Sequence, residues 1–484
     1  MKASALVVAL SLCVVTGGRI GTLPGVKGGD HHFAGLLTVP SPWGNLSTFY
    51  YYVPHADPTK PLLIWMNGGP GASSLNGLFS ELGPHLLNLN GAPTNLSNTS
   101  GWSAFDNPSS WSSEASLLVW EQPSGVGFSR CLGGCPAVWN DTSSAEANVA
   151  ILRAFYAMHP EARTRGLFIS GESYAGIYVP LLAQQVLHSS DLPQLRGAAV
   201  GNGCVGYGVS GGCGLDALDV FVSTIERKAP GVDRQLLATA RAACPGELNR
   251  GLLPSQLSAS CKAAMEALIR DLGDYNFYHW ASPCGPEGQG NWGDGSAFAC
   301  GNGVLEAYLA LPETQRALNV IGAGEPPLTW QQWDGDSQFY NITTADALPA
   351  YRELLEHNVS VLIYNGLADT GVPFVGAEKW VPLVAGPKIA RARRKWGSGF
   401  GGTGFAGWVI TYGSGLTLAT IAGAGHMVPG DRPVQAQSML TSWLGGVELP
   451  EYKGAACKRL WLGRGWGDFC GSAHGNARGA FTNE

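Results

Sequence analysis

Charged residues are scarce in this sequence: they make up 14% of its 484 residues, against ~25% in an average soluble domain. The formal net charge of −6 gives no general basic footprint for nucleic acid. The 68 glycines follow no three-residue repeat, which excludes collagen. An apolar fraction of 45%, with 16 Trp, 15 Tyr and 16 Phe, excludes a disordered chain. At about three times the ~150 residues of a typical domain, the chain can bury a large core.

A run of ~20 apolar residues, as needed to cross a bilayer, is also missing. The longest candidate is the short stretch from Ala5 to Val15, which follows Lys2 and precedes the small residues Thr16 to Gly18. This layout predicts a cleavable signal peptide over residues 1–18, and no membrane span. We therefore expect entry to the secretory pathway, followed by secretion or by delivery to a vacuole or lysosome.

Cysteine and sequon patterns agree with that compartment. Removing Cys13 with the signal leaves an even number of cysteines, which favours disulfides over a zinc site because no Cys-x2-Cys or nearby His pair is present. Spacing suggests, without fixing, the pairs Cys131–Cys135, Cys204–Cys213, Cys244–Cys261, Cys284–Cys300 and Cys457–Cys470. Sequons open to glycosylation stand at Asn45, Asn95, Asn98, Asn140, Asn341 and Asn358.

Short apolar runs rich in β-branched and aromatic residues predict buried parallel strands. They lie at Pro61–Met66, Ser116–Trp120, Leu167–Ser170, Ala198–Gly201, Ser360–Tyr364 and Leu416–Ile421, with Phe49–Val53 as a possible antiparallel neighbour. Helical stretches lie between them; the clearest ends at Met158 and could be capped by Asp141, Thr142 or Ser143. The alternation predicts an α/β fold, a mixed but mostly parallel sheet with helices on both faces.

Two segments break the alternation. Residues 204–304 hold most of the remaining cysteines and read as a disulfide-rich inserted cap. Residues 388–407 are basic and then glycine-rich, but they lack the strand and the Lys-Ser/Thr of a phosphate-binding loop. We expect a solvated, flexible loop there, with a processing site or an anionic contact as the alternative.

The sharpest local signal is Gly171-Glu172-Ser173-Tyr174-Ala175-Gly176, directly after a predicted strand. A tight strand-to-helix turn exposes a serine and aims the first helical N–H groups at developing negative charge. Gly171 and Ala175 are the small residues that such a turn needs. An ordinary turn with an N-cap serine would also fit this stretch taken alone.

Two later loops favour the catalytic interpretation. Asp369 follows the strand at Ser360–Tyr364, and His426 follows the strand at Leu416–Ile421. The order Ser173, Asp369, His426 is that of α/β-hydrolases, in which the histidine takes the serine proton and the acid orients the imidazole. The domains are accordingly predicted as an α/β-hydrolase core at 19–203 and 305–484, interrupted by the cap at 204–304.

Residues 67–71, Asn-Gly-Gly-Pro-Gly, follow the first predicted parallel strand. Glycines let backbone N–H groups approach a bound carbonyl closely. Gly69 and Tyr174 are therefore the predicted oxyanion donors, although the same residues would also suit a plain tight turn.

With these residues in place, the chain resembles the serine carboxypeptidase family. The matching stretches occur in order and cover most of the chain outside the cap: WMNGGPGASSLNGLFSELGP (65–84), EQPSGVGFS (121–129), FISGESYAGIYVP (168–180), VGNG (200–203), YLALPETQRALNV (308–320), YNGLADTGVP (364–373) and GAGHMVPGDRP (423–433). Ala72 departs from the cysteine found in many members, so a disulfide from that position is absent.

The resemblance implies release of C-terminal amino acids from peptides and proteins through an acyl-enzyme. It assigns recognition of the terminal carboxylate to Asn67, Gly68, Glu81 and Glu172, and places Trp65 and Met427 beside them. Two adjacent carboxyl groups cannot both ionise cheaply, so they should share a proton and favour activity at acidic pH.

Two other functions remain open at this stage: an acyltransferase using the same acyl-enzyme, and a stabilising partner protein whose hydrolase activity is incidental. No cofactor or metal is expected, because the nucleophile, the base and the oxyanion donors are all protein groups. The expected oligomeric state is a monomer or a homodimer.

Overall fold

The computed structural model describes residues 17–87, 104–280, 304–330, 339–398, 404–461 and 466–470, apart from 27, 30, 134, 230, 252–253, 274–275 and 455–456. The predicted signal peptide and the pair Cys284–Cys300 lie wholly or almost wholly outside these residues.

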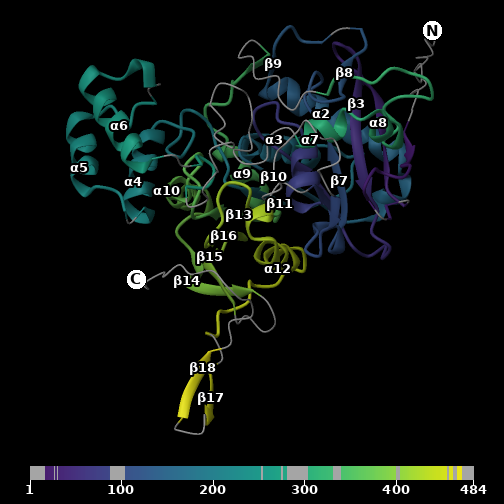
Figure 1. Ribbon diagram of the computed structural model, residues 1–484. Helices are drawn as coiled ribbons and strands as arrows, with labels where there is room; N and C mark the ends of the chain where they lie inside the picture. The colour runs from purple at the N-terminus through teal and green to yellow at the C-terminus, as the bar shows by residue number, and fades with distance from the viewer. Residues whose placement is uncertain are drawn as a thin grey trace, which may run out of the picture.

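A sheet of twelve strands forms the centre of the molecule, in the order β1-β2-β3-β7-β4-β10-β11-β13-β16-β15-β14, with β8 paired to β3 (Figure 1). The six strands from β7 to β16 in this order run parallel, and both flanks are antiparallel. The strands are β1 Gly18–Arg19, β2 Phe33–Ser41, β3 Gly44–Val53, β4 Leu62–Met66, β7 Ser116–Trp120, β8 Arg130–Cys131, β10 Leu167–Glu172, β11 Leu195–Gly201, β13 Ser360–Gly366, β14 Ile389–Ser398, β15 Gly404–Tyr412 and β16 Leu416–Ile421. All seven predicted strands are present.

Helices cover both faces of the sheet because successive residues of each buried strand point to opposite sides. In β4, for example, Leu62 and Ile64 belong to one hydrophobic cluster and Leu63 and Trp65 to another. The first cluster includes α2 Asp141–Met158, α3 Ala175–Leu187, α9 Leu348–Glu356 and α10 Phe374–Ala385. The second includes α1 Leu75–Gly77, η1 Leu78–Leu82, α7 Val304–Leu309, α8 Pro312–Ala317, α11 Val428–Asp431 and α12 Pro433–Leu444.

Three helices, α4 Ala217–Lys228, α5 Arg234–Ala243 and α6 Ala259–Leu272, lie to one side of the sheet (Figure 1). They share a small hydrophobic cluster of their own, and the disulfide Cys244–Cys261 joins α5 to α6. This arrangement agrees with an inserted cap, although its exact limits stay a prediction.

The remaining elements are short: β5 His85–Leu87 with β6 Ala104–Asp106, β9 Trp139–Asn140 with β12 Tyr340–Asn341, η2 Trp111–Ser113, η3 Pro160–Thr164 and η4 Pro254–Gln256. A C-terminal hairpin, β17 Cys457–Trp461 with β18 Trp466–Cys470, extends away from the body (Figure 1). Its register places Cys457 opposite Cys470, as the suggested pairing requires. Three of the suggested disulfides are formed within the described residues: Cys131–Cys135, Cys204–Cys213 and Cys244–Cys261.

Two local predictions are wrong. Much of the expected loop at 388–407 is regular structure, because Ile389–Ser398 forms β14 and pairs with β15 at the edge of the sheet. The basic side chains are held there by Glu378, Glu448 and Glu451. The N-cap of α2 is Asn140, one residue before the three predicted, where it forms a capping box with Ser143.

Candidate active site

Ser173 lies in the turn between β10 and α3, where its φ of +63° is unusual for a residue with a side chain. A Cβ on Gly171 would come within 2.4 Å of the Met66 carbonyl oxygen, so only glycine fits before the turn. The Ser173 N–H donates to Gly201 O at 3.0 Å, and its carbonyl accepts from Gly176 N at 2.9 Å. The serine is therefore held in a strained turn at the carboxyl edge of the sheet, as a nucleophile elbow requires.

Asp369 and His426 meet on the same edge. His426 Nδ1 lies 2.7 Å from Asp369 Oδ2, and both side chains are buried. Asp369 also accepts hydrogen bonds from Gly371 N at 2.7 Å and Val372 N at 3.1 Å. Contact at Nδ1 makes Nε2 the ring nitrogen available to a nucleophile. Within the described residues, the Ser173 hydroxyl makes no hydrogen bond to His426, a contact that often tightens only when substrate binds.

Asn202, which directly follows β11, is a further partner that sequence reasoning quoted in a motif but gave no role. Its Nδ2 donates to Asp369 Oδ2 at 2.8 Å, and its Oδ1 accepts from Gly366 N at 3.0 Å. Its φ of +42° places the amide between β13 and the aspartate. Asn202 thus fixes both Asp369 and the end of the strand that precedes it.

A segment from the cap region, residues 276–280, passes between the two catalytic loops. Tyr278 O accepts from His426 N at 2.7 Å, and the two rings are in contact, with centroids 4.6 Å apart and planes inclined by 37°. Trp280 N donates to Ala368 O at 3.0 Å. No motif in the sequence pointed to this segment, because its contacts are made largely by the backbone.

The predicted oxyanion donors are brought together by close backbone packing. A Cβ on Gly68 would lie 2.3 Å from Tyr174 N and 2.8 Å from Ser173 Cβ, so the glycine allows the two loops to touch. Gly69 has a φ of +105°, which favours glycine. In the described part of the chain, neither Gly69 N–H nor Tyr174 N–H donates a hydrogen bond. Both groups therefore remain free to bind an oxyanion.

The four residues assigned to carboxylate recognition lie next to this turn. Asn67 Nδ2 donates to Glu172 Oε1 at 2.9 Å, and Asn67 Oδ1 accepts from Trp65 Nε1 at 2.8 Å. Trp65 is fully buried, so it orients Asn67 rather than lining an open pocket. Gly77 makes room for this pair, because a Cβ there would lie 2.1 Å from Trp65 Nε1.

Glu81, on the short π-helix η1, lies beside Glu172, and both are almost completely buried. Burial raises the pKa of both carboxyl groups, and the charge of Glu81 raises that of Glu172 further. No described group donates a hydrogen bond to either oxygen of Glu81 or to Glu172 Oε2. The site thus holds a pair of acids that favours one shared proton and has oxygens free for a ligand.

Other features of the predicted site are less central. Met427 is half-buried at the start of α11, beside His426.

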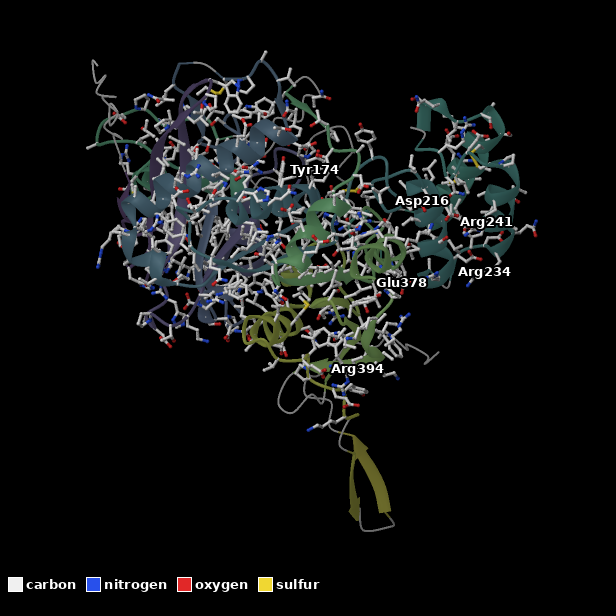
Figure 2. The ribbon with its side chains drawn as sticks, turned by 180° about the vertical axis from the view of Figure 1, so that it is seen from behind. Tyr174, Asp216, Arg234, Arg241, Glu378 and Arg394 are labelled. Carbon is white, nitrogen blue, oxygen red and sulfur yellow. A yellow bond between two sulfur atoms is a disulfide. The ribbon has the colours of Figure 1, made fainter. Side chains whose placement is uncertain are left out.

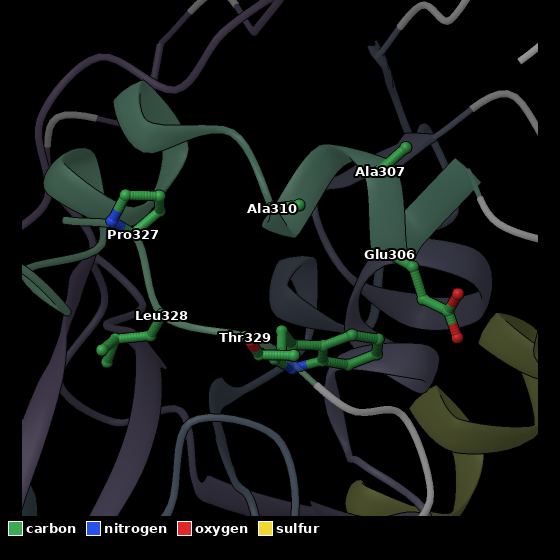
Figure 3. Close-up of a pocket in the computed structure, with 7 residues that line it drawn as sticks. Glu306, Ala307, Ala310, Pro327, Leu328 and Thr329 are labelled. Carbon is green, nitrogen blue, oxygen red and sulfur yellow. The ribbon is translucent and has the colours of Figure 1, made fainter. Parts of the chain in front are cut away.

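A hollow of about 530 Å³ lies elsewhere, beside α7 (Figure 3), and none of the predicted site residues lines it. It is lined by Glu306, Ala307, Ala310, Pro327, Leu328, Thr329 and Trp330. The described residues contain no group of three or more His, Cys, Asp or Glu suited to a metal ion.

The sheet order, the elbow and the Asp369–His426 pair define an α/β-hydrolase, which confirms the predicted fold class. Over residues 24–446 the chain matches the model of the serine carboxypeptidase family. It is 30% identical to Serine carboxypeptidase-like 36 of Arabidopsis thaliana, over 87% of this chain and 83% of that protein. Identity is also 30% to Serine carboxypeptidase-like 22 of the same plant, over 89% and 93%.

Among solved structures, the chain is similar to Kex1(delta)p, a prohormone-processing carboxypeptidase from Saccharomyces cerevisiae. The TM-score is 0.66 at 21% identity, covering 87% of this chain and 92% of that one. This likeness concerns the fold, whereas the family match concerns the sequence. The chain belongs to the serine carboxypeptidase family.

Proposed function

We propose that this protein is a serine-type carboxypeptidase that releases C-terminal amino acids from peptides and proteins, with highest activity at acidic pH. The observation that carries the proposal is the buried pair Glu81 and Glu172 beside Ser173. A hydrolase that bound only neutral acyl groups would gain nothing from two buried carboxyls that cost free energy to bury.

The proposed reaction begins with attack of Ser173 Oγ on the last peptide carbonyl while His426 Nε2 accepts the hydroxyl proton. Asp369 holds the imidazolium through Nδ1. Gly69 N–H and Tyr174 N–H bind the oxyanion. His426 then protonates the departing amino group. Next, His426 takes a proton from a water that attacks the acyl carbonyl, and returns it to Ser173 Oγ as the ester bond breaks and the shortened peptide leaves.

Recognition of the substrate's terminal carboxylate follows from the same geometry. Asn67 Nδ2 and Gly68 N–H supply donors, and the proton shared by Glu81 and Glu172 supplies a third. An ionised pair would repel the carboxylate instead. Asn67 therefore acts twice, by binding substrate and by holding Glu172.

The test compares a blocked dipeptide with a free C-terminal carboxyl group and the same dipeptide as its amide. Wild type should release the amino acid from the free acid far faster than it cleaves the amide, and Ser173→Ala should do neither. Glu81→Gln should reduce the preference for the free acid. Equal turnover of both substrates at every pH would contradict the proposal; ester formation from an activated acyl donor and an alcohol, without amino acid release, would favour the acyltransferase.

The proposal also includes entry to the secretory pathway, and a hydrolase core at 19–203 and 305–484 with an inserted cap at 204–304. Secretion, or delivery to an acidic vacuole or lysosome, suits a site that needs a shared proton on buried acids. The sequon residues Asn45, Asn341 and Asn358 are exposed, as attachment of a glycan requires. None of the helices in the described ranges is both long and apolar enough to cross a membrane.

A further inference from the structure

Asp141 is a buried acid that the proposed reaction does not use. It is the first residue of α2, is 1% exposed, and has no ion-pair partner among the described residues. Its Oδ1 accepts from Tyr174 OH at 2.6 Å and from Tyr340 OH at 2.9 Å. Its Oδ2 accepts from Thr343 N at 2.8 Å, Thr343 Oγ1 at 3.1 Å and Thr344 N at 2.6 Å.

Five donors without a neighbouring cation form an arrangement suited to an ionised carboxylate, whose two oxygens only accept. The amino end of α2 adds a favourable dipole. Asp141 consequently joins α2, the start of α3 and residues 340–344, which are distant in sequence. Such a cluster is expensive to bury unless every group is satisfied, as it is here.

The contact to Tyr174 matters because the backbone N–H of this residue is a proposed oxyanion donor. Its ring is buried and packs edge-on against Tyr178, with centroids 5.1 Å apart. Tyr178 OH in turn accepts from Gly71 N at 3.3 Å, in the loop that carries the other donor, Gly69. The two segments that carry the proposed oxyanion donors are therefore both in contact with one group of tyrosines, which the hydrogen bonds to Asp141 hold in place.

We propose that Asp141 is a positioning residue of the oxyanion hole: by holding the Tyr174 hydroxyl it fixes the direction of the Tyr174 backbone N–H. This inference rests on the proposed acyl-transfer function. An oxyanion donor stabilises the transition state only when it is aimed at the oxygen in advance. Displacement of reacting groups by about 1 Å can reduce the rate by ~100-fold.

The decisive variant is Tyr174→Phe, which keeps the ring and the backbone N–H and removes only the bond to Asp141. Asp141→Ala removes the anchor itself. The matched control is Tyr50→Phe. Tyr50 is also buried, and its hydroxyl is hydrogen-bonded to His159 Nε2 at 3.2 Å, but this residue lies on β3 and not in the proposed site. For each protein, kcat and KM are measured with an activated acyl ester, together with the inhibition constant of a peptide boronic acid and the melting temperature.

We expect Tyr174→Phe and Asp141→Ala to lower kcat by about 10- to 100-fold with KM changed less than about twofold. Affinity for the boronic acid, which forms a tetrahedral adduct, should fall by the same factor. Tyr50→Phe should change neither. If Tyr174→Phe lowers only the melting temperature, or changes nothing, the inference is overturned. If wild type neither cleaves the ester nor binds the boronic acid, the proposed function itself fails.

Discussion

The carboxyl groups of Glu81 and Glu172 are buried beside each other, although one residue lies on η1 and the other ends β10. Two neighbouring buried carboxylates repel each other, so the pair favours one shared proton. Burial is the main cause of the raised pKa of each group. The pair therefore stays singly protonated well above the pH at which an exposed glutamic acid ionises.

Activity on free-acid peptides should fall as pH rises through the raised pKa of this pair. Loss of the shared proton removes a donor and leaves a second negative charge facing the substrate carboxylate, so KM should rise while kcat changes less. The measurement is a pH profile of kcat/KM for a free-acid peptide and for an ester that lacks the carboxylate. A decline at the same pH for both substrates would show that the loss does not come from recognition of the carboxylate.

Stability should depend on the same proton, with a defined sign. Because the folded protein holds a proton that the unfolded chain loses near the ordinary glutamic acid pKa of ~4.3, this contribution is complete below that pH. It is lost as pH rises toward the raised folded value. Glu172→Gln removes the part of this dependence that Glu172 contributes, so its melting temperature relative to wild type should increase from pH 4 to pH 8. A constant difference across that range would show that the pair is not protonated in the folded state.

Asn202→Gly should separate the role of the Asn202 amide from that of its backbone. Glycine tolerates the φ of +42° but cannot donate to Asp369. A hydrogen bond to a charged group contributes about 1.5–3 kcal/mol, so we expect kcat to fall roughly 10- to 100-fold with little change in KM. Steady-state kinetics on an activated ester measures this; an unchanged kcat would mean that Gly371, Val372 and His426 hold Asp369 sufficiently.

The sequence allowed the parallel core to be predicted because its strands are buried on both faces and therefore read as continuous apolar runs. Strand β14 was missed for the opposite reason. Its residues from Ile389 to Lys395 are mostly exposed and basic, as is common at a sheet edge, where charge discourages pairing with other chains. Only its pairing with β15 shows that it is a strand.

The same contrast holds within the site. Ser173, Asp369 and His426 follow predictable strands, so their meeting at one edge could be inferred from the order of motifs. The contact of the Tyr278 ring with His426 comes from the cap region, which carries no periodic or motif signal. Asp141 was considered only as a helix cap, because its five donors lie far away in sequence and are visible only in the folded chain.

Charged contacts connect α4 and Asp216, the residue before it, to α10, which carries Glu378 (Figure 2). Lys379 Nζ on α10 donates to Asp216 Oδ2 at 2.6 Å and to Asp219 Oδ2 at 2.9 Å. Asp216 is 5% exposed, and the contact with this lysine and the hydrogen bond from Gly211 N compensate for its burial. The neighbouring pair Arg227–Glu378 is more exposed, with 51% and 26% of the side chains accessible.

Lys379→Met should therefore destabilise the protein by about 1–3 kcal/mol, because it leaves a buried carboxylate without its cation beside a second acid. Arg227→Met, the matched control at the same interface, should change stability by less than about 1 kcal/mol. Urea denaturation at low and at high salt measures both. The loss in Lys379→Met should persist at high salt, since a buried pair is screened weakly, whereas any loss in Arg227→Met should fade. Equal losses in the two variants would mean that burial of Asp216 does not decide the strength of the contact.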